Sequence, residues 1–277
     1  MPTSIPPSTS VQSPHSFSTI VKNFFRELGW FILKEARASL FAGSFLALLI
    51  VSRYVEIPGI YRYDFLFVAA IFIQVGMMIA RLETVDEAKT IALFHLIGLV
   101  LEIYKTHPAI GSWSYPEPGY FKIFNVPLYS GFMYASIGSY IARAWKELKL
   151  RLEHYPSYIA SIVLCLLIYL NFFTNHFVYD IRMFLIVGIF IMYFKTRIYF
   201  LPHMKEYNMP LSLGFLLIAV FVWIAENIGT FTGAWIYPHQ AYGWHAVSLQ
   251  KITSWFLMVV ISFIIVAYLK HFKATRT

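Results

Sequence analysis

The chain has 277 residues, of which 58% are hydrophobic, 19% are aromatic and only 13% are charged. A soluble domain carries about 25% charged residues, so this composition excludes a water-facing surface of ordinary polarity and predicts a membrane protein. Lys and Arg in cytoplasmic loops account for the net charge of +8, so we expect the lipid bilayer as a partner and no nucleic acid.

Residues 1–20 are rich in Ser, Pro and Thr, which predicts a disordered N-terminal tail. After this tail, long runs lack Asp, Glu, Lys and Arg, and several approach the roughly 20 apolar residues that cross a hydrocarbon core. The expected fold class is therefore all-α, a polytopic transmembrane bundle of about eight helices. These helices are predicted near residues 38–55, 63–80, 87–105, 128–144, 157–174, 181–197, 209–230 and 250–270.

The distribution of charge predicts the direction in which the helices cross. Sixteen Lys and Arg fall on the side that holds both termini, and six fall on the other side. Because cytoplasmic loops are enriched in these residues, we expect a multi-pass cell-membrane protein with both termini in the cytoplasm. On the same side, Thr84-Val-Asp-Glu87 is typical of a capping box that begins the third helix.

A six-residue pattern, Gly-x-Trp-x-Tyr-Pro, occurs twice, at residues 111–116 and 233–238. A glutamate precedes each copy, and these two, Glu102 and Glu226, are 124 positions apart. Each half of the chain then has four predicted helices, and an even number preserves orientation. We therefore expect two parallel membrane repeats, residues 21–149 and 150–277, related by an axis along the membrane normal.

Glu102 and Glu226 are the candidate catalytic residues, as an acid/base pair. Burial disfavours the charged form of a carboxyl, and two neighbouring carboxylates do not both ionise easily, so one can hold a proton for donation. His95 lies seven residues before Glu102 and is a candidate proton relay. The alternatives stay open: Lys105 can pair with Glu102, and His95 can serve helix packing.

The outer side of the predicted bundle carries aromatic and polar side chains that are candidates to bind an apolar ligand. The alternative for the aromatic ones is to anchor loops at the headgroup level. No metal is expected, because the chain has no HxxH or HExxH spacing, and no cofactor is expected, because it has no phosphate loop or dinucleotide fingerprint. The candidate ligand-binding residues are Trp113, Tyr115, Trp235, Tyr237, Asn227, His239 and Asn171.

Several longer segments resemble a known family. They are Arg81-Leu-Glu-Thr, Asn171-Phe-Phe-Thr and residues 111–118, 130–140 and 225–239. From about residue 25 to residue 270 the chain resembles the YoaT-like bacterial membrane proteins, the domain of unknown function 817. The resemblance implies an integral membrane protein of a bacterial inner membrane and no established activity.

A shorter likeness suggests a chemistry. Glu102, the following Gly-x-Trp-x-Tyr and Val126-Pro127-Leu128 are similar to the arrangement in membrane carotenoid hydratases and lycopene cyclases. Those enzymes act on isoprenoid chains within the bilayer, with acidic residues as proton donors.

Three functions follow as hypotheses. The first is a membrane-embedded acid/base enzyme that acts on an isoprenoid or other lipid, with Trp and Tyr faces that stabilise a carbocation. The second is a proton-coupled small-molecule transporter with its site between the repeats. The third is a structural membrane protein. The sequence assigns no substrate and no oligomeric state.

Overall fold

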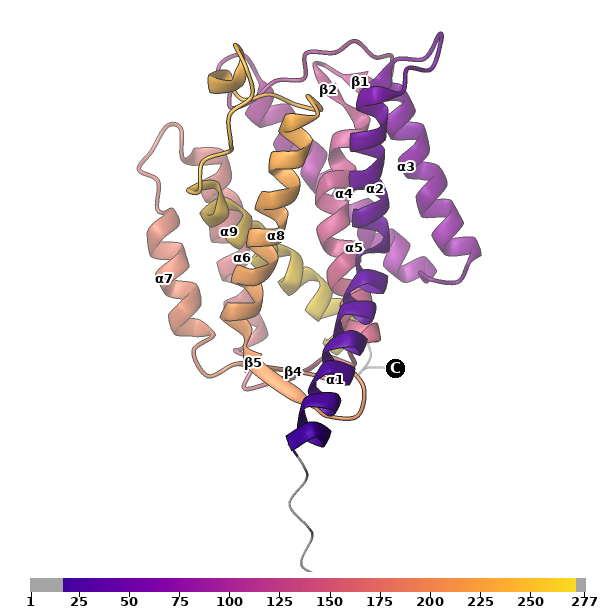
Figure 1. The fold of residues 1–277 in the computed structure, drawn as a ribbon. Helices are drawn as coiled ribbons and strands as arrows, with labels where there is room; N and C mark the ends of the chain where they lie inside the picture. Colours follow the sequence, from indigo (N-terminus) through magenta and orange to yellow (C-terminus); the bar gives the residue numbers. More distant parts are fainter. Residues whose placement is uncertain (1–16, 273–277) are drawn as a thin grey trace, which may run out of the picture.

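The computed structural model describes residues 17–272, which fold into nine α-helices and five short strands (Figure 1). The protein is mostly helical, as expected, and the eight predicted helices correspond in order to α2 through α9. The helices are α1 (Phe17–Ala38), α2 (Leu40–Tyr54), α3 (Arg62–Ile79), α4 (Val85–Thr106), α5 (Gly131–Glu147), α6 (Tyr158–Thr174), α7 (Arg182–Met192), α8 (Leu211–Phe231) and α9 (Lys251–Ala267).

Helix α1 was not predicted from the sequence. It begins at Phe17, inside the segment expected to be a disordered tail, and residues 1–16 of that segment lie outside the described part of the chain. Polar residues such as Lys22, Arg26 and Glu35 interrupt its apolar runs, so it lacks the unbroken hydrophobicity by which the other helices were recognised. At Ser39 the chain bends by 68° into α2.

The five short strands depart from the all-α expectation. β1 (Lys122–Ile123) pairs with β2 (Val126–Pro127), and β3 (Arg151–Glu153), β4 (Arg197–Phe200) and β5 (Tyr207–Pro210) form an antiparallel sheet in that order. This sheet joins the connection between α5 and α6 to the connection between α7 and α8, at one end of the bundle (Figure 1). Strands of two to four residues are too short for alternation to predict them.

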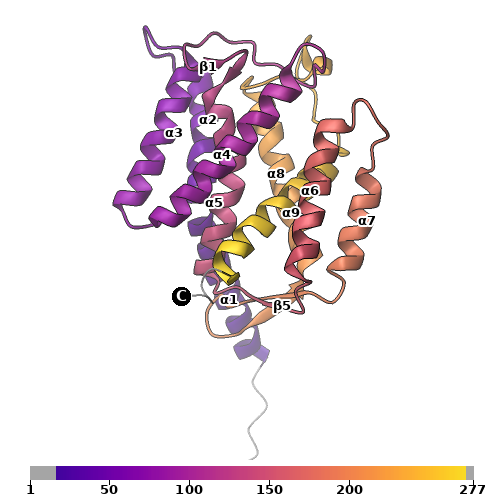
Figure 2. The ribbon, with the colours of Figure 1, turned by 180° about the vertical axis from the view of Figure 1, so that it is seen from behind.

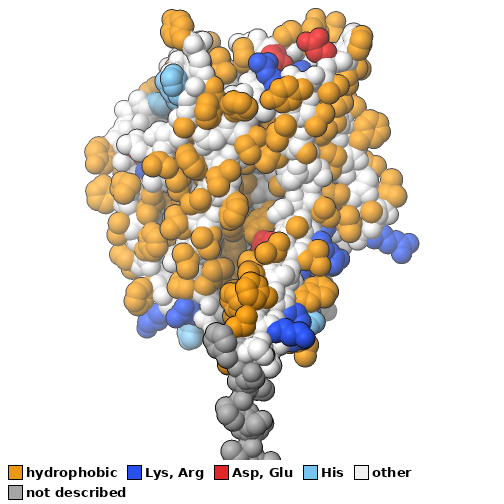
Figure 3. All heavy atoms as spheres, in the orientation of Figure 1, with side chains coloured by type: hydrophobic (Ala, Val, Ile, Leu, Met, Phe, Trp, Pro, Cys, Tyr) orange, Lys and Arg blue, Asp and Glu red, His pale blue; other side chains and the backbone are white. Residues whose placement is uncertain are grey.

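The surface between the two ends of the bundle is apolar. Three helices are long and apolar enough to cross a membrane: α3, α8, and α9 together with its continuation to Lys270. The bent pair α1–α2 makes a fourth if its two helices count as one span. Large hydrophobic side chains such as Phe72 and Ile79 remain more than 70% exposed. Figure 3 shows them covering one face, with Lys and Arg gathered toward the end that carries the sheet. Such a surface is that of a protein that associates with a membrane.

Helices α4 and α5 pack closely, and this contact positions the candidate site. A Cβ atom at Gly98 would lie 2.4 Å from Tyr134 Cδ2, and one at Gly138 would lie 2.3 Å from Phe94 Cδ2. Only glycine permits these approaches, one from each helix. Seen from behind, α5 lies next to the lower end of α9, which it contacts (Figure 2).

The predicted capping box at the start of α4 is confirmed. Thr84 Oγ1 accepts a hydrogen bond from the Glu87 amide at 3.2 Å, and Glu87 Oε2 accepts one from the Thr84 amide at 2.8 Å. Two backbone donors that the first turn leaves free are thereby satisfied.

Candidate functional site

Glu102 and Glu226 line one cavity of about 680 Å³. Helices α1, α2, α5, α8 and α9 supply most of its walls, and the loops contribute Trp113, Trp235 and Tyr237 at the end away from the sheet. The two glutamates are only 2% and 4% exposed. Because they share one space, a single ligand can contact both.

Three side chains hold the Glu102 carboxyl by hydrogen bonds. Trp113 Nε1 and the Tyr115 hydroxyl both donate to Oε2 at 2.7 Å, and the Tyr134 hydroxyl donates to Oε1 at 2.7 Å. Trp113 and Tyr115 belong to the first Gly-x-Trp-x-Tyr-Pro motif, whereas Tyr134 comes from α5. The buried carboxyl is therefore fully supplied with donors, which a charge in an apolar interior requires.

Glu226 has a similar environment, with two donors in place of three. The hydroxyl of Tyr237, from the second motif, donates to Oε1, and Trp255 Nε1 donates to Oε2 at 2.7 Å. Trp255 lies on α9, 29 residues after Glu226, much as Tyr134 lies on α5, 32 residues after Glu102. The rings of these two helix-borne donors meet with centroids 6.3 Å apart, so the two clusters are contiguous.

The two motifs pair with each other through equivalent positions. Ser114 and Ile236, each between the Trp and the Tyr of its motif, exchange two backbone hydrogen bonds of 2.9 and 3.0 Å in an antiparallel bridge. The motif glycines Gly111 and Gly233 have φ values of +59° and +72°. A side chain disfavours this backbone conformation, so glycine is required to turn each motif toward the other.

Lys251, at the first position of α9, supplies a positive charge beside the aromatic residues. Its Nζ lies 4.4 Å from the ring centroid of Tyr237 and 5.4 Å from that of Trp113. Such cation–π contacts stabilise the ammonium group and fix both rings at the end of the cavity away from the sheet.

The loop tyrosines act as neutral donors. Burial, followed by the nearby Glu102 carboxyl, raises the pKa of Tyr115 well above its usual range. Burial, followed by the Glu226 carboxyl, does the same to the pKa of Tyr237. Both phenols therefore keep their protons at any physiological pH, and the protons that the site can exchange belong to the carboxyls.

Of the sequence-predicted ligand-binding residues, the structure brings Trp113, Trp235 and Tyr237 to the cavity wall, and Tyr115 to Glu102. Trp235 makes no contact with Glu226 comparable to that of Trp113 with Glu102. Its ring instead covers Gly229, where an added Cβ would lie 2.1 Å from Trp235 Cη2.

The other predicted residues lie outside the cavity wall. Asn171 binds Asp180 at 3.0 Å and the Ile181 amide at 3.1 Å, and thereby connects α6 to α7. The Asn227 carbonyl oxygen accepts from the Val247 amide at 2.9 Å. The remaining two are aromatic neighbours: the ring of His239 stacks on Tyr237, and that of His95 lies 4.4 Å from Phe132.

His95 Nδ1 is buried without a hydrogen-bond partner among the described residues. The contacts of His95 therefore join it to the α5 helix rather than to Glu102. In the part of the chain that is described, no three His, Cys, Asp or Glu side chains are grouped so as to hold a metal ion.

Sequence reasoning missed five residues of the site: Tyr134, Trp255, Lys251, Glu35 and Tyr140. A signal existed for two of them. The two motif tryptophans are 122 positions apart. When the two halves are aligned at this offset, Tyr134 falls one residue from Trp255, so the alignment could have indicated that the two residues occupy equivalent positions.

Comparison with known proteins places the chain in a family. Residues 27–263 match DUF817, described as a protein of unknown function. "Uncharacterized protein YoaT" of Bacillus subtilis (strain 168) is 49% identical over 245 residues, which cover 88% of this chain and 91% of the relative. No solved structure matches the chain significantly. The matched region contains both glutamates and both motifs, and the chain belongs to the DUF817 family.

Proposed function

We propose that the chain is a multi-pass membrane protein with eight crossings, the first made by α1 and α2 together and the others by α3 to α9. The apolar surface supports this. So does the length of α8, whose 21 residues rise about 31 Å, enough to cross a hydrocarbon core. The excess of Lys and Arg toward the end with the sheet supports a cytoplasmic location for that end and for both termini.

The proposal includes two parallel repeats, residues 21–149 and 150–277. The motif pairing supports it, because a bridge between equivalent positions is what a two-fold axis between Ser114 and Ile236 would produce. The matching donors on Glu102 and Glu226 support it as well.

The function that this geometry supports best is acid/base catalysis on an isoprenoid or other apolar lipid within the bilayer. The observation that carries the proposal is the placement of two buried glutamates in one apolar cavity. A carboxyl within a membrane costs about 2.5–3.5 kcal/mol on insertion scales and by default indicates a functional site.

The chemistry divides between the two glutamates. Glu226 donates a proton to a carbon–carbon double bond and leaves a carbocation. Glu102 then accepts a proton from a neighbouring carbon or from an attacking water, which gives an isomerised, cyclised or hydrated product. Glu102 has three hydrogen-bond donors and Glu226 has two, which favours the carboxylate form, the form that a base needs, at Glu102 over Glu226. The faces of Trp113, Trp235 and Trp255 can stabilise the cation.

Lipid extracts of cells with and without the protein test the proposal. We expect their isoprenoid or other apolar lipids to differ, and Glu226→Gln and Glu102→Gln to remove the difference. A Gln side chain fits the hydrogen-bond network at either position. Its carbonyl oxygen can accept from the Trp that donates to the Glu, while its NH2 group donates to a tyrosine hydroxyl. Glu153→Gln, in the exposed sheet, is the matched control and should leave the lipids as in wild type. Identical extracts from all strains would refute the enzyme.

One observation favours transport as a second candidate function. The cavity extends from the glutamates at the end away from the sheet to Leu150 and Ile198 beside the sheet, so its lining reaches toward both ends of the bundle. Proton-coupled transport predicts uptake into proteoliposomes that follows a pH gradient, with no change in lipid chemistry. A structural role predicts instead that both Gln variants keep full function.

A further inference from the structure

The cavity lining is acidic, and the nearest cation described above, Lys251, lies beside its aromatic end and not in the lining. The described lining includes three carboxyl groups, those of Glu35, Glu102 and Glu226, and no Lys, Arg or His. None of these three takes part in an ion pair among residues 17–272. In a site of low dielectric, like charges repel strongly, so this lining opposes an anionic ligand.

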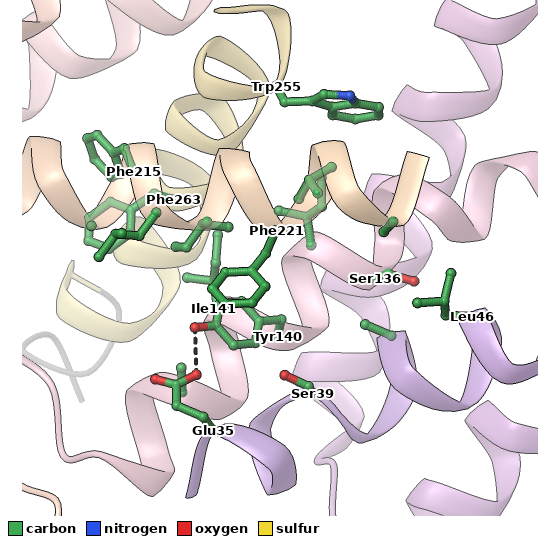
Figure 4. A pocket seen from close by; sticks show the side chains of 18 of the residues that line it. Glu35, Ser39, Leu46, Ser136, Tyr140, Ile141, Phe215, Phe221, Trp255 and Phe263 are labelled. Atoms are coloured by element: carbon green, nitrogen blue, oxygen red, sulfur yellow. Dashed lines mark hydrogen bonds between the residues drawn. The ribbon is translucent and has the colours of Figure 1, made fainter. Parts of the chain in front are cut away.

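Glu35 forms a polar position distinct from the Glu102–Glu226 pair. Its Oε2 accepts a hydrogen bond from the Tyr140 hydroxyl at 2.8 Å, and no other hydrogen bond to the carboxyl is present in the described chain. Oε1 is therefore free to accept a proton donor, and the Tyr140 oxygen is free to accept as well. Figure 4 shows this pair, from α1 and α5, with the carboxyl of Glu35 directed toward the hydroxyl of Tyr140.

The Glu35–Tyr140 pair lies where the cavity reaches the surface. Three lining residues of α1 and α8 are exposed apolar side chains: Ile32 is 59% exposed, Leu217 is 46% and Phe221 is 70%. In Figure 3 the face that carries these helices is hollowed along its middle. This opening is on the apolar side of the bundle, so a molecule enters from the bilayer and passes the carboxyl of Glu35.

The two polar positions are separated by a fixed distance along α5. Tyr134, which binds Glu102, and Tyr140, which binds Glu35, are six residues apart, a rise of about 9 Å. Apolar residues line the space between them, among them Ile137 and Met133. A ligand that touches both positions has an apolar segment on the order of 10 Å between its polar end and its reacting part.

We propose that the cavity binds a long-chain alcohol, whose uncharged hydroxyl group donates to Glu35 and accepts from no cation, while its apolar chain extends to Glu102 and Glu226. The inference rests on the proposed function and names its substrate class. A hydroxyl group fits because it can donate its proton to Glu35 Oε1, one of the two acceptor atoms left free at this position. It also costs less to bring into an apolar site than an ammonium group does.

The test uses the full chain in nanodiscs of uncharged phospholipid and three probes with one isoprenoid chain: geranylgeraniol, geranylgeranylamine and geranylgeranyl monophosphate. Binding is followed by the fluorescence of Trp113, Trp235 and Trp255, which line the cavity. We expect the alcohol to bind at least about tenfold more tightly than the monophosphate, and more tightly than the amine.

Two variants assign the selectivity to Glu35. Glu35→Gln keeps an acceptor and removes the charge, so the preference for alcohol over monophosphate should fall severalfold. Glu35→Ala removes the acceptor, so the affinity for the alcohol itself should fall. Glu147→Gln is the matched control, because Glu147 pairs with Arg37 outside the cavity wall, and it should behave as wild type.

Each other outcome overturns the inference. Monophosphate bound as tightly as alcohol, amine bound more tightly than alcohol, or an unchanged preference in Glu35→Gln would refute the assignment and leave the proposed function standing. If no probe binds and the lipid extracts also do not change, the proposed function fails together with it.

Discussion

Gly229→Ala tests the placement of the second motif against α8. A methyl group at residue 229 would lie 2.1 Å from Trp235 Cη2 and 2.5 Å from Cζ3, far inside van der Waals contact. The indole cannot withdraw easily, because it is 7% exposed and the next residue, Ile236, is bound to Ser114. Overpacking of this kind destabilises a protein by about 1–3 kcal/mol.

Thermal unfolding in detergent measures the effect, with a thiol-reactive dye on Cys165, the single cysteine, as the probe. Gly188→Ala in α7 is the matched control: nothing lies within 4 Å of its added Cβ, so it should be neutral or stabilising by up to about 1 kcal/mol. Trp235→Phe removes the clashing atoms, so the double variant should be more stable than the sum of the two single changes predicts. If Gly229→Ala is as stable as Gly188→Ala, the packing of Trp235 described here is wrong.

Three further variants test other parts of the structure in the same assay. Trp255→Phe leaves Glu226 with one donor fewer and should cost about 1–3 kcal/mol, and no loss would show that the bond contributes nothing. Asp64→Ala should destabilise the protein by a similar amount, because the Asp64 carboxyl accepts hydrogen bonds from two backbone amides of the loop after the first motif, at 2.8 and 2.9 Å. Asp86→Ala, at a largely exposed position, is the control. Thr84→Ala should destabilise by about 1 kcal/mol through loss of the capping box, and an unchanged melting temperature would contradict that role.

The sequence predicted those features that depend on local pattern. Runs of apolar residues predicted α2 through α9, and the spacing of Thr84 and Glu87 predicted the start of α4. The recurrence of Gly-x-Trp-x-Tyr-Pro singled out Glu102 and Glu226 as equivalent residues, but it left open whether the two share one cavity, as they do in the structure.

Features that depend on tertiary packing were not predictable in this way. The two motif tryptophans occupy equal positions in the sequence, yet Trp113 binds Glu102 whereas Trp235 packs on Gly229. The indole donor to Glu226 is instead Trp255, which is 29 residues away in the sequence and is brought there by the packing of α9. Glu35 was overlooked for a related reason: on a helix with several charged residues, only its neighbours in space distinguish it.

The opening of the cavity at α1 and α8 determines the concentration scale on which ligand affinity has to be measured. Under the proposed function, ligands enter through it from the bilayer, so occupancy would depend on the mole fraction of the ligand among the lipids rather than on its concentration in water. An alcohol that is scarce in the cell but confined to the membrane can therefore saturate the cavity. Diluting the same protein and ligand in detergent micelles would empty the cavity without any change in the contacts of Phe221 or Glu35.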